Sequence, residues 1–252
     1  MEKAYSFFDQ FEISRLIPIN PMGNLDVSIT NSTLFLGLAT LYIIFMFQTN
    51  VENGLVVPGR YQSVIEVIYE TFHDMVRENI PGKDGYRFFP FLLTLGIFIL
   101  VNNLFGLIPY TFSATSHMAI TVAISCGIFI ATLLIGFSTW KLDYLSRFMP
   151  GGAPLALAPL LVLIEIISYI MTAFVLGVRL AGNIIAGHLL FAILSSFTWQ
   201  MLMIGGWLAV GSIIPFGITL AVTLLEIAVA GIQAYVFVLL TVIYLNDALH
   251  LH

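Results

Sequence analysis

A long apolar stretch in the second half of this chain contains a small set of titratable and charged side chains. The stretch covers the 99 residues from 148 to 246. It has three formally charged residues, Glu165, Arg179 and Glu226, and one histidine, His188. A charge at the centre of a bilayer costs from ~2.5 to more than ~10 kcal/mol. Carboxylates and histidine exchange protons, whereas arginine keeps its charge. This set of residues is typical of a proton or ion pathway inside a membrane.

Each of these residues also has a structural interpretation. Glu165 and Glu226 would also fit neutral acids that hydrogen-bond between helices, and His188 would fit a buried structural histidine. Arg179 would fit an ion pair with one of the glutamates.

Other polar residues of the apolar segments also have both a functional and a structural interpretation. The amides of Gln233, Asn183, Asn102 and Asn103 fit either a pathway or interhelical hydrogen bonds. Asp247 lies near the C-terminus, where it would fit a solvated carboxylate.

The composition places the chain among integral membrane proteins. Of its 252 residues 59% are hydrophobic and only 9% are charged, whereas soluble domains carry about 25% charged residues. A single cysteine, Cys126, excludes a disulfide framework and argues against a thiolate metal site. The sequence has no phosphate-binding loop and no basic patch, so we expect no cofactor, no metal and no nucleic-acid partner.

Hydropathy and periodicity divide the first half of the chain into three spans and one surface helix. Residues 27–51 predict the first membrane span, because about 20 apolar residues cross a bilayer. In residues 60–80, apolar side chains recur at helical spacing on one face and charged side chains occupy the other face. This pattern predicts an amphipathic helix that lies in the membrane surface or, alternatively, on a soluble partner. Residues 81–87 predict a turn, and residues 88–140 predict two spans, at about 88–108 and 118–138.

Residues 159–246 are too long for two ordinary spans. From residue 160 to 200 there is no proline, and one helix over that run would be ~60 Å long, twice the ~30 Å of the hydrocarbon core. Either each half forms two short spans, or each half is one long, tilted helix. Residues 199–207, WQMLMIGGW, predict the turn between the halves.

The intramembrane polar residues favour the two long antiparallel helices. Three pairs are symmetric in sequence about residues 206 and 207; they are Glu165 with Asp247, Arg179 with Gln233, and His188 with Glu226. A hairpin would bring each pair to one level. This arrangement suits two half-channels separated by a fixed cation. The predicted fold is therefore an all-α membrane protein, a single domain over residues 1–252, with five membrane-crossing helices and one surface helix.

Several segments resemble subunit a of the F-type ATP synthase over essentially the whole chain. In LGVRLAGNIIAGHLL (176–190) an arginine is followed four residues later by asparagine and nine residues later by histidine, as in that family. NNLFGLIPYTF (102–112), PLLVLIEIISY (159–169), LEIAVAGIQAYVF (225–237) and YLNDALHLH (244–252) are also similar. His188 and the C-terminal segment look like the mitochondrial form and its alphaproteobacterial relatives.

The resemblance implies a function and a set of partners. It implies a stator subunit of a rotary motor, with no catalysis of its own, that passes protons to and from carboxylates on a ring of c subunits. Further membrane and peripheral-stalk subunits, and lipid, are implied neighbours. The implied location is the mitochondrial inner membrane or, alternatively, a bacterial plasma membrane. The alternative function is a self-contained secondary ion transporter or channel subunit, although the chain has no internal repeat.

The resemblance also implies roles for individual residues. Arg179 would face the ring carboxylate and separate the half-channels. The inlet residues would be His188 and Glu226, and the outlet residues would be Glu165 and Asp247. Asn183 and Gln233 would flank the arginine, and further pathway candidates are Asn102, Asn103 and Tyr244.

Overall fold

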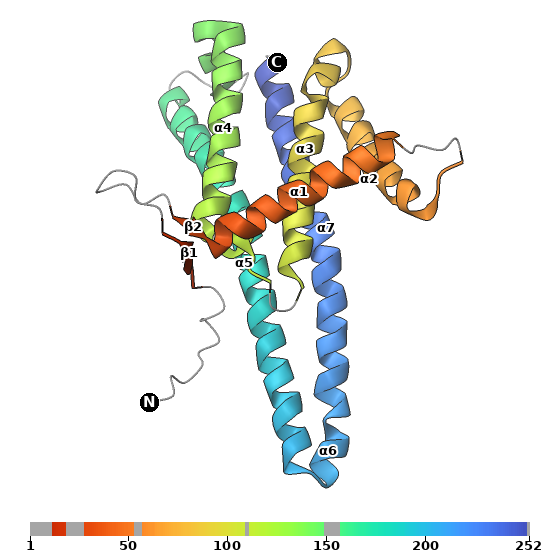
Figure 1. Ribbon diagram of the computed structural model, residues 1–252. Coiled ribbons are helices and arrows are strands. Elements are labelled where there is room, and N and C mark those ends of the chain that lie inside the picture. Colours follow the sequence, from red (N-terminus) through yellow and green to blue (C-terminus); the bar gives the residue numbers. More distant parts are fainter. Residues whose placement is uncertain (1–11, 19–27, 53–56, 109–110, 149–156, 251–252) are drawn as a thin grey trace. The chain divides into compact units, whose positions relative to one another are not determined.

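Helices dominate the computed structural model, which describes residues 12–18, 28–52, 57–108, 111–148 and 157–250. Five helices are long and apolar enough to cross a membrane. They are α1 (Asn31–Glu52), α3 (Lys83–Gly106), α4 (Met118–Trp140), α5 (Ala158–Ile204) and α7 (Ile213–Leu249) (Figure 1). The predicted all-α membrane fold is therefore confirmed.

The remaining elements are short, apart from one amphipathic helix. They are strands β1 (Arg15–Ile17) and β2 (Ile29–Thr30), which pair antiparallel, helix α2 (Arg60–Asn79), 3-10 segments η2 (Ala114–Ser116) and η3 (Lys141–Phe148), and helix α6 (Trp207–Gly211). Pro109 and most of the Pro/Gly-rich segment 150–159 lie outside the described residues.

The chain forms two compact units, and α1, α3, α5 and α7 each contribute residues to both. The hairpin unit comprises the described parts of residues 1–49, 98–117 and 180–233. The second unit comprises the described parts of residues 50–97, 118–179 and 234–252. The expectation of a single membrane domain stays a prediction.

The amphipathic segment forms a helix with the expected periodicity. In α2 the buried side chains are Ile65, Phe72, Met75 and Val76. A Cβ atom at Gly96 of α3 would overlap the ring of Phe72, so glycine at this position lets α2 pack closely against α3. The location of α2 in the membrane surface stays a prediction.

The predicted turn over residues 81–87 is wrong for most of its length. Helix α3 already begins at Lys83, five residues before the expected start. Pro81 and Gly82 reverse the chain, and Gly82 adopts a φ of 99°, which glycine tolerates. The following residues are then free to form the first helical turn, where Asp84 interacts favourably with the helix dipole.

Two long helices, rather than four short ones, account for most of residues 159–246. Helix α5 has 47 residues and α7 has 37. The chain reverses between them at Gly205 and Gly206, with φ values of 75° and 59°, inside the turn expected at residues 199–207. In the hairpin unit the end of α5 and the start of α7 therefore run antiparallel, joined through α6 (Figure 1). The tilt of these helices in the membrane stays a prediction.

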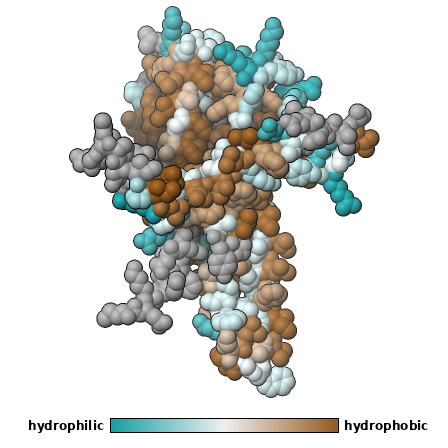
Figure 2. Space-filling view, in the orientation of Figure 1, coloured by the Kyte–Doolittle hydropathy of each residue, from teal (hydrophilic) through white to brown (hydrophobic). Residues whose placement is uncertain are grey.

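Large apolar side chains cover the hairpin. Among the exposed ones are Leu190, Ile193 and Phe197 of α5 and Leu220 and Leu224 of α7. Figure 2 shows that this surface is largely hydrophobic. Exposed apolar surface of this extent requires lipid or another membrane protein around it.

The contact between α2 and α3 generates the first prediction. Gly96→Ala should lower the stability of the chain by about 1–3 kcal/mol, because the added methyl group overlaps the ring of Phe72. Thermal unfolding of the purified protein in detergent measures this effect. The control is Gly127→Ala in α4, where a Cβ meets nothing within 4 Å. Equal melting temperatures for the two variants would contradict this packing.

Candidate functional site

The carboxyl group of Glu226 lies against the backbone of Gly187 in the hairpin unit. A Cβ atom at residue 187 would overlap Oε1 of Glu226 and come within 2.6 Å of its Cδ. Glycine is therefore required at this level of α5 for the carboxyl group to lie between the helices. His188 is the next residue on α5 and therefore lies near the level of Glu226. That the two side chains act as a pair stays a prediction.

A small cavity in the same unit is lined by several predicted pathway residues. Its volume is about 20 Å³, and its polar lining residues are Asn103, Asn183, Glu226 and Gln233. Asn103 donates a hydrogen bond from Nδ2 to the carbonyl of Ala230 at 3.4 Å. Asn103 Oδ1 and Glu226 Oε1 are buried and have no hydrogen-bond partner among the described residues. A cavity of this size holds about one water molecule, and polar groups of this kind bind buried water.

The loop between α3 and α4 adds further polar groups to the hairpin unit. His188 forms a hydrogen bond with the backbone of Gly106, at the end of α3. His117, at the end of this loop, stacks on Phe112 at 5.2 Å between ring centroids. Burial lowers the pKa of His117 below its usual value, which favours the neutral imidazole near pH 7.

The asparagine next to Asn103 has a different role. Asn102 is 6% exposed and donates from Nδ2 to the carbonyl of Phe98 at 2.8 Å, within its own helix. It does not line the cavity that contains Asn103. Of the two asparagines, only Asn103 faces the cavity with Glu226.

Arg179 lies at one end of a groove in the second unit. The groove has a volume of about 270 Å³ and is lined on α5 by Ser168, Thr172 and Arg179, with apolar residues between them, and on α7 by Leu240. Arg179 is exposed and forms no ion pair within the described part of the chain. An ion pair with Glu165, one form of the structural alternative, is therefore not observed within this unit.

Glu165 and Asp247 differ in their surroundings. Glu165 is exposed on α5. Asp247 accepts a hydrogen bond at Oδ2 from Nη2 of Arg147, at 2.6 Å, with side-chain exposures of 18% for Arg147 and 36% for Asp247. Asp247 is therefore held in an ion pair between η3 and α7 and is not a freely solvated carboxylate.

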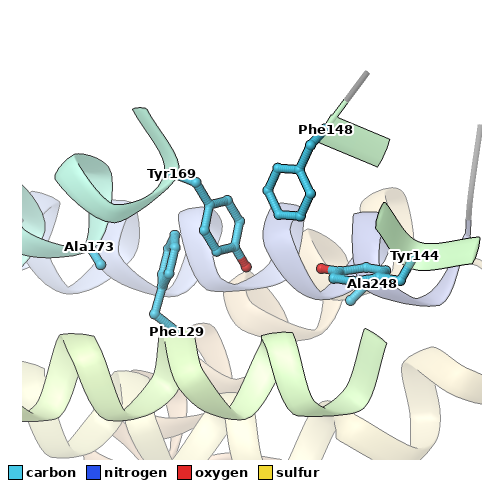
Figure 3. Packing of buried hydrophobic residues seen from close by; sticks show 6 residues of the cluster. All are labelled: Phe129, Tyr144, Phe148, Tyr169, Ala173 and Ala248. Atoms are coloured by element: carbon cyan, nitrogen blue, oxygen red, sulfur yellow. The ribbon is translucent and has the colours of Figure 1, made fainter. Parts of the chain in front are cut away.

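An aromatic cluster surrounds this ion pair. Tyr169 lies between Phe129 and Phe148, at 4.0 Å and 6.0 Å between ring centroids (Figure 3). The guanidinium of Arg147 lies 5.7 Å from the ring of Tyr169. Tyr244, a predicted pathway residue, packs edge-on against Tyr169 at 5.2 Å. These contacts place Tyr244 in the packing that fixes the end of α7.

Two glycines of α5 provide space for close packing. Gly177 packs against Val122 of α4, and Gly187 accommodates Glu226, so both serve contacts within the chain. Sequence reasoning missed the roles of Gly187 and Arg147. In the sequence, Gly187 could have been identified because it precedes the only histidine of α5. Arg147 could have been identified because it is an arginine in a loop beside an apolar helix.

Other expected groupings are not tested by these contacts. Arg179 belongs to the second unit and Gln233 to the hairpin unit, so their pairing stays a prediction. The described residues contain no cluster of three or more histidine, cysteine or acidic side chains that would bind a metal ion.

The ion pair between η3 and α7 generates the second prediction. Arg147→Gln and Asp247→Asn should each destabilise the protein by about 1–3 kcal/mol, because each leaves a partly buried partner without its charged contact. The double variant should lose about 1 kcal/mol less than the sum of the two. Thermal unfolding of all three, with the exposed Lys141→Gln as control, measures the coupling. Strict additivity would show that the contact contributes nothing.

Comparison with known proteins identifies the family of this chain. Residues 31–246 match the family described as ATP synthase A chain. The chain is 44% identical over 244 residues to "ATP synthase subunit a" of Chondrus crispus, covering 97% of this chain and 96% of that protein. It is 43% identical over 248 residues to the Rhodospirillum rubrum protein of that name (98% and 100%), and 46% identical over 252 residues to the Marchantia polymorpha protein (99% and 100%). The chain therefore belongs to the ATP synthase A chain family.

Proposed function

We propose that this chain is the proton-translocating stator subunit of a rotary F-type ATP synthase. It would provide two offset aqueous half-channels that deliver protons to, and collect them from, carboxylates on a ring of c subunits. The observation that carries the proposal is Arg179, an exposed arginine on an apolar helix with no ion pair in the described chain. The membership of the ATP synthase A chain family supports it.

An exposed arginine on a membrane helix requires a partner from outside the chain. Its guanidinium cannot lose its proton to avoid the cost of desolvation. At ~4 Å and an effective dielectric constant of 20, a carboxylate attracts it by about 4 kcal/mol. An interaction of this size favours the ionised carboxylate during contact and still allows the carboxylate to move away. A mobile carboxylate on a neighbouring subunit fits this requirement.

Glu226 and His188 are the proposed inlet groups. The cavity beside Glu226 has room for about one water molecule. Unpaired acceptor atoms on Asn103 and Glu226 give such a water polar contacts. Protonated Glu226 would pass its proton through this water towards the ring, and Asn183 and Gln233 would orient the water from the same cavity lining. His188, the residue after Gly187, would supply protons to Glu226 from the aqueous side.

Glu165 is the proposed outlet group. It is exposed on α5, and Ser168 and Thr172 line the groove that ends at Arg179. Glu165 and Arg179 are 14 residues apart, about 21 Å along a helix, so hydroxyl groups and water must carry the proton across this interval. Asp247, held in the ion pair with Arg147, would be the second outlet group.

Arg179 would prevent direct passage between the two half-channels. His188 and Glu165 lie on opposite sides of Arg179 in sequence, 9 and 14 residues away, or about 14 Å and 21 Å along a helix. A proton crossing directly between them would have to pass a fixed positive charge. Protons would therefore travel on the ring carboxylates, which couples proton flow to rotation.

The proposal assigns no catalytic reaction to this chain. ATP chemistry would belong to other subunits of the complex, and the c-ring, membrane subunits and peripheral-stalk subunits would be the partners. The membrane would be the mitochondrial inner membrane or that of a related bacterium, since relatives include algal, plant and bacterial proteins. A self-contained transporter is not favoured, because the relatives are named as subunits of an ATP synthase.

Substitution of Arg179 tests the proposed coupling. Arg179→Lys keeps the charge but loses the planar, bidentate guanidinium, so assembled complexes should show little or no proton-driven ATP synthesis. Arg179→Ala should also assemble and should leak protons, because nothing would then separate the half-channels. Proton flux and ATP synthesis are measured in reconstituted complexes under an imposed potential. Normal synthesis in either variant would refute the assigned role, and failure to assemble would favour a structural role.

Gly187 tests the position of the inlet carboxylate. Gly187→Ala should reduce proton-driven synthesis by about tenfold or more, because the methyl group overlaps Glu226 and displaces its carboxyl group from the cavity. The control is Gly217→Ala in α7, where a Cβ meets nothing within 4 Å. ATP synthesis by reconstituted complexes, normalised to assembled complex, is the measurement. Full activity in Gly187→Ala would show that this position of the carboxyl group is not required.

A further inference from the structure

Another cavity, in the second unit, contains none of the proposed pathway residues. It lies between the end of α2 and the start of α3 and has a volume of about 190 Å³. Its polar side chains come from His73, Arg77 and Tyr86, and the turn at Pro81 and Gly82 forms one wall. The proposed proton pathway gives no reason for a basic cavity at this position.

The lining of this cavity is basic. His73 and Arg77 line it, and no acidic residue does. Asp74 approaches Nδ1 of His73 at 3.6 Å, but its side chain is 70% exposed and lies outside the lining. Arg77 is exposed and forms no ion pair with any described residue. The cavity therefore favours an anion, with Arg77 as the main cation.

Ring contacts hold the histidine in place. His73 stacks on Tyr69 at 6.1 Å and meets Phe89 edge-on at 5.4 Å, between ring centroids. Tyr86 lies 6.4 Å from the same ring. Aromatic pairs at these separations are favourable, so the polar wall of the cavity is ordered before a ligand binds.

The position of the cavity in the chain indicates a membrane interface. Helix α2 is amphipathic, and α3 begins an apolar span at Lys83. Val64 and Val67 of α2 and Phe91 of α3 are at least half exposed. A basic cavity next to exposed apolar side chains matches both parts of a lipid, its headgroup and its acyl chains.

We propose that this cavity binds the phosphate headgroup of an anionic phospholipid. The guanidinium of Arg77 would form charge-assisted hydrogen bonds with the phosphate oxygens, and Tyr86 would donate from its hydroxyl group. The acyl chains would lie along the exposed apolar residues. Since no carboxylate lines the cavity to pair with a headgroup cation, an anionic lipid binds more tightly than a zwitterionic one. A free phosphate ion lacks the acyl chains and gains nothing from the apolar surface.

Photolabelling of the whole assembled complex tests this site. The complex is reconstituted into nanodiscs that contain a photoactivatable phosphatidylglycerol or the matching phosphatidylcholine, and labelled peptides are identified by mass spectrometry. Labelling by the phosphatidylglycerol should concentrate in residues 73–89. Arg77→Gln should lower it by about tenfold, as expected for loss of the main charge-assisted contact. The matched control is Arg60→Gln, because Arg60 is exposed on the same helix and does not line the cavity.

Each other outcome would overturn the proposal. Equal labelling by the two lipids would show that the site does not distinguish the charge of the headgroup. Equal labelling of Arg77→Gln and Arg60→Gln would show that Arg77 does not bind the headgroup. Loss of labelling on addition of inorganic phosphate would indicate a free-anion site. Absence of labelling in these residues would indicate that another subunit covers the cavity. His73→Gln provides a second variant, with an expected several-fold decrease, if Arg77→Gln fails to assemble.

Discussion

Arg179 imposes the constraint on which the rest of this protein depends. A guanidinium group cannot become neutral, so an apolar helix that carries one must either pair it within the chain or present it to a partner. Within the described residues it has no ion pair and lies exposed at the end of a groove. The long helix α5, which extends well beyond one bilayer thickness, provides room for proton-exchanging groups on both sides of this charge.

The other polar side chains divide according to whether their hydrogen bonds are satisfied. Asp247 and Arg147 satisfy each other and are surrounded by aromatic rings, which is the behaviour of a structural contact. Glu226 and Asn103 retain buried oxygen atoms without partners among the described residues, beside a cavity of the size of one water molecule. Unsatisfied buried atoms cost free energy, and a water or a transferred proton is the natural way to satisfy them. The division separates groups that hold the helices from groups suited to proton transfer.

Glycines determine which of these arrangements is sterically allowed. Gly187 provides the space for the Glu226 carboxyl group, Gly96 the space for the Phe72 ring, and Gly177 the approach of α4 to α5. In each case a single methyl group would overlap a neighbouring atom. Close packing of this kind leaves little tolerance for added volume, so the position of the Glu226 carboxyl group depends on a residue that has no side chain.

The sequence by itself determined the helices and the residues of interest. Hydropathy and periodicity are local properties, so the spans, the amphipathic helix and the reversal at Gly205 and Gly206 were predictable from the chain. The start of α3 was missed because Pro81 and Gly82 complete the turn earlier than the pattern suggested. The charges of the apolar stretch identified the candidate residues, because any charge in such a stretch is costly.

Only the tertiary structure decided how these residues are used. Asn103 reaches the carbonyl of Ala230, 127 residues away, and Arg147 reaches Asp247, 100 residues away. Which carboxylate is paired and which faces a cavity follows from the register and rotation of packed helices. Apolar helices in lipid associate through van der Waals packing and interhelical hydrogen bonds, so side-chain volume, including the absence of a side chain at Gly187, sets that register. A sequence pattern records which residues are present, but the packing of distant segments decides which atoms meet.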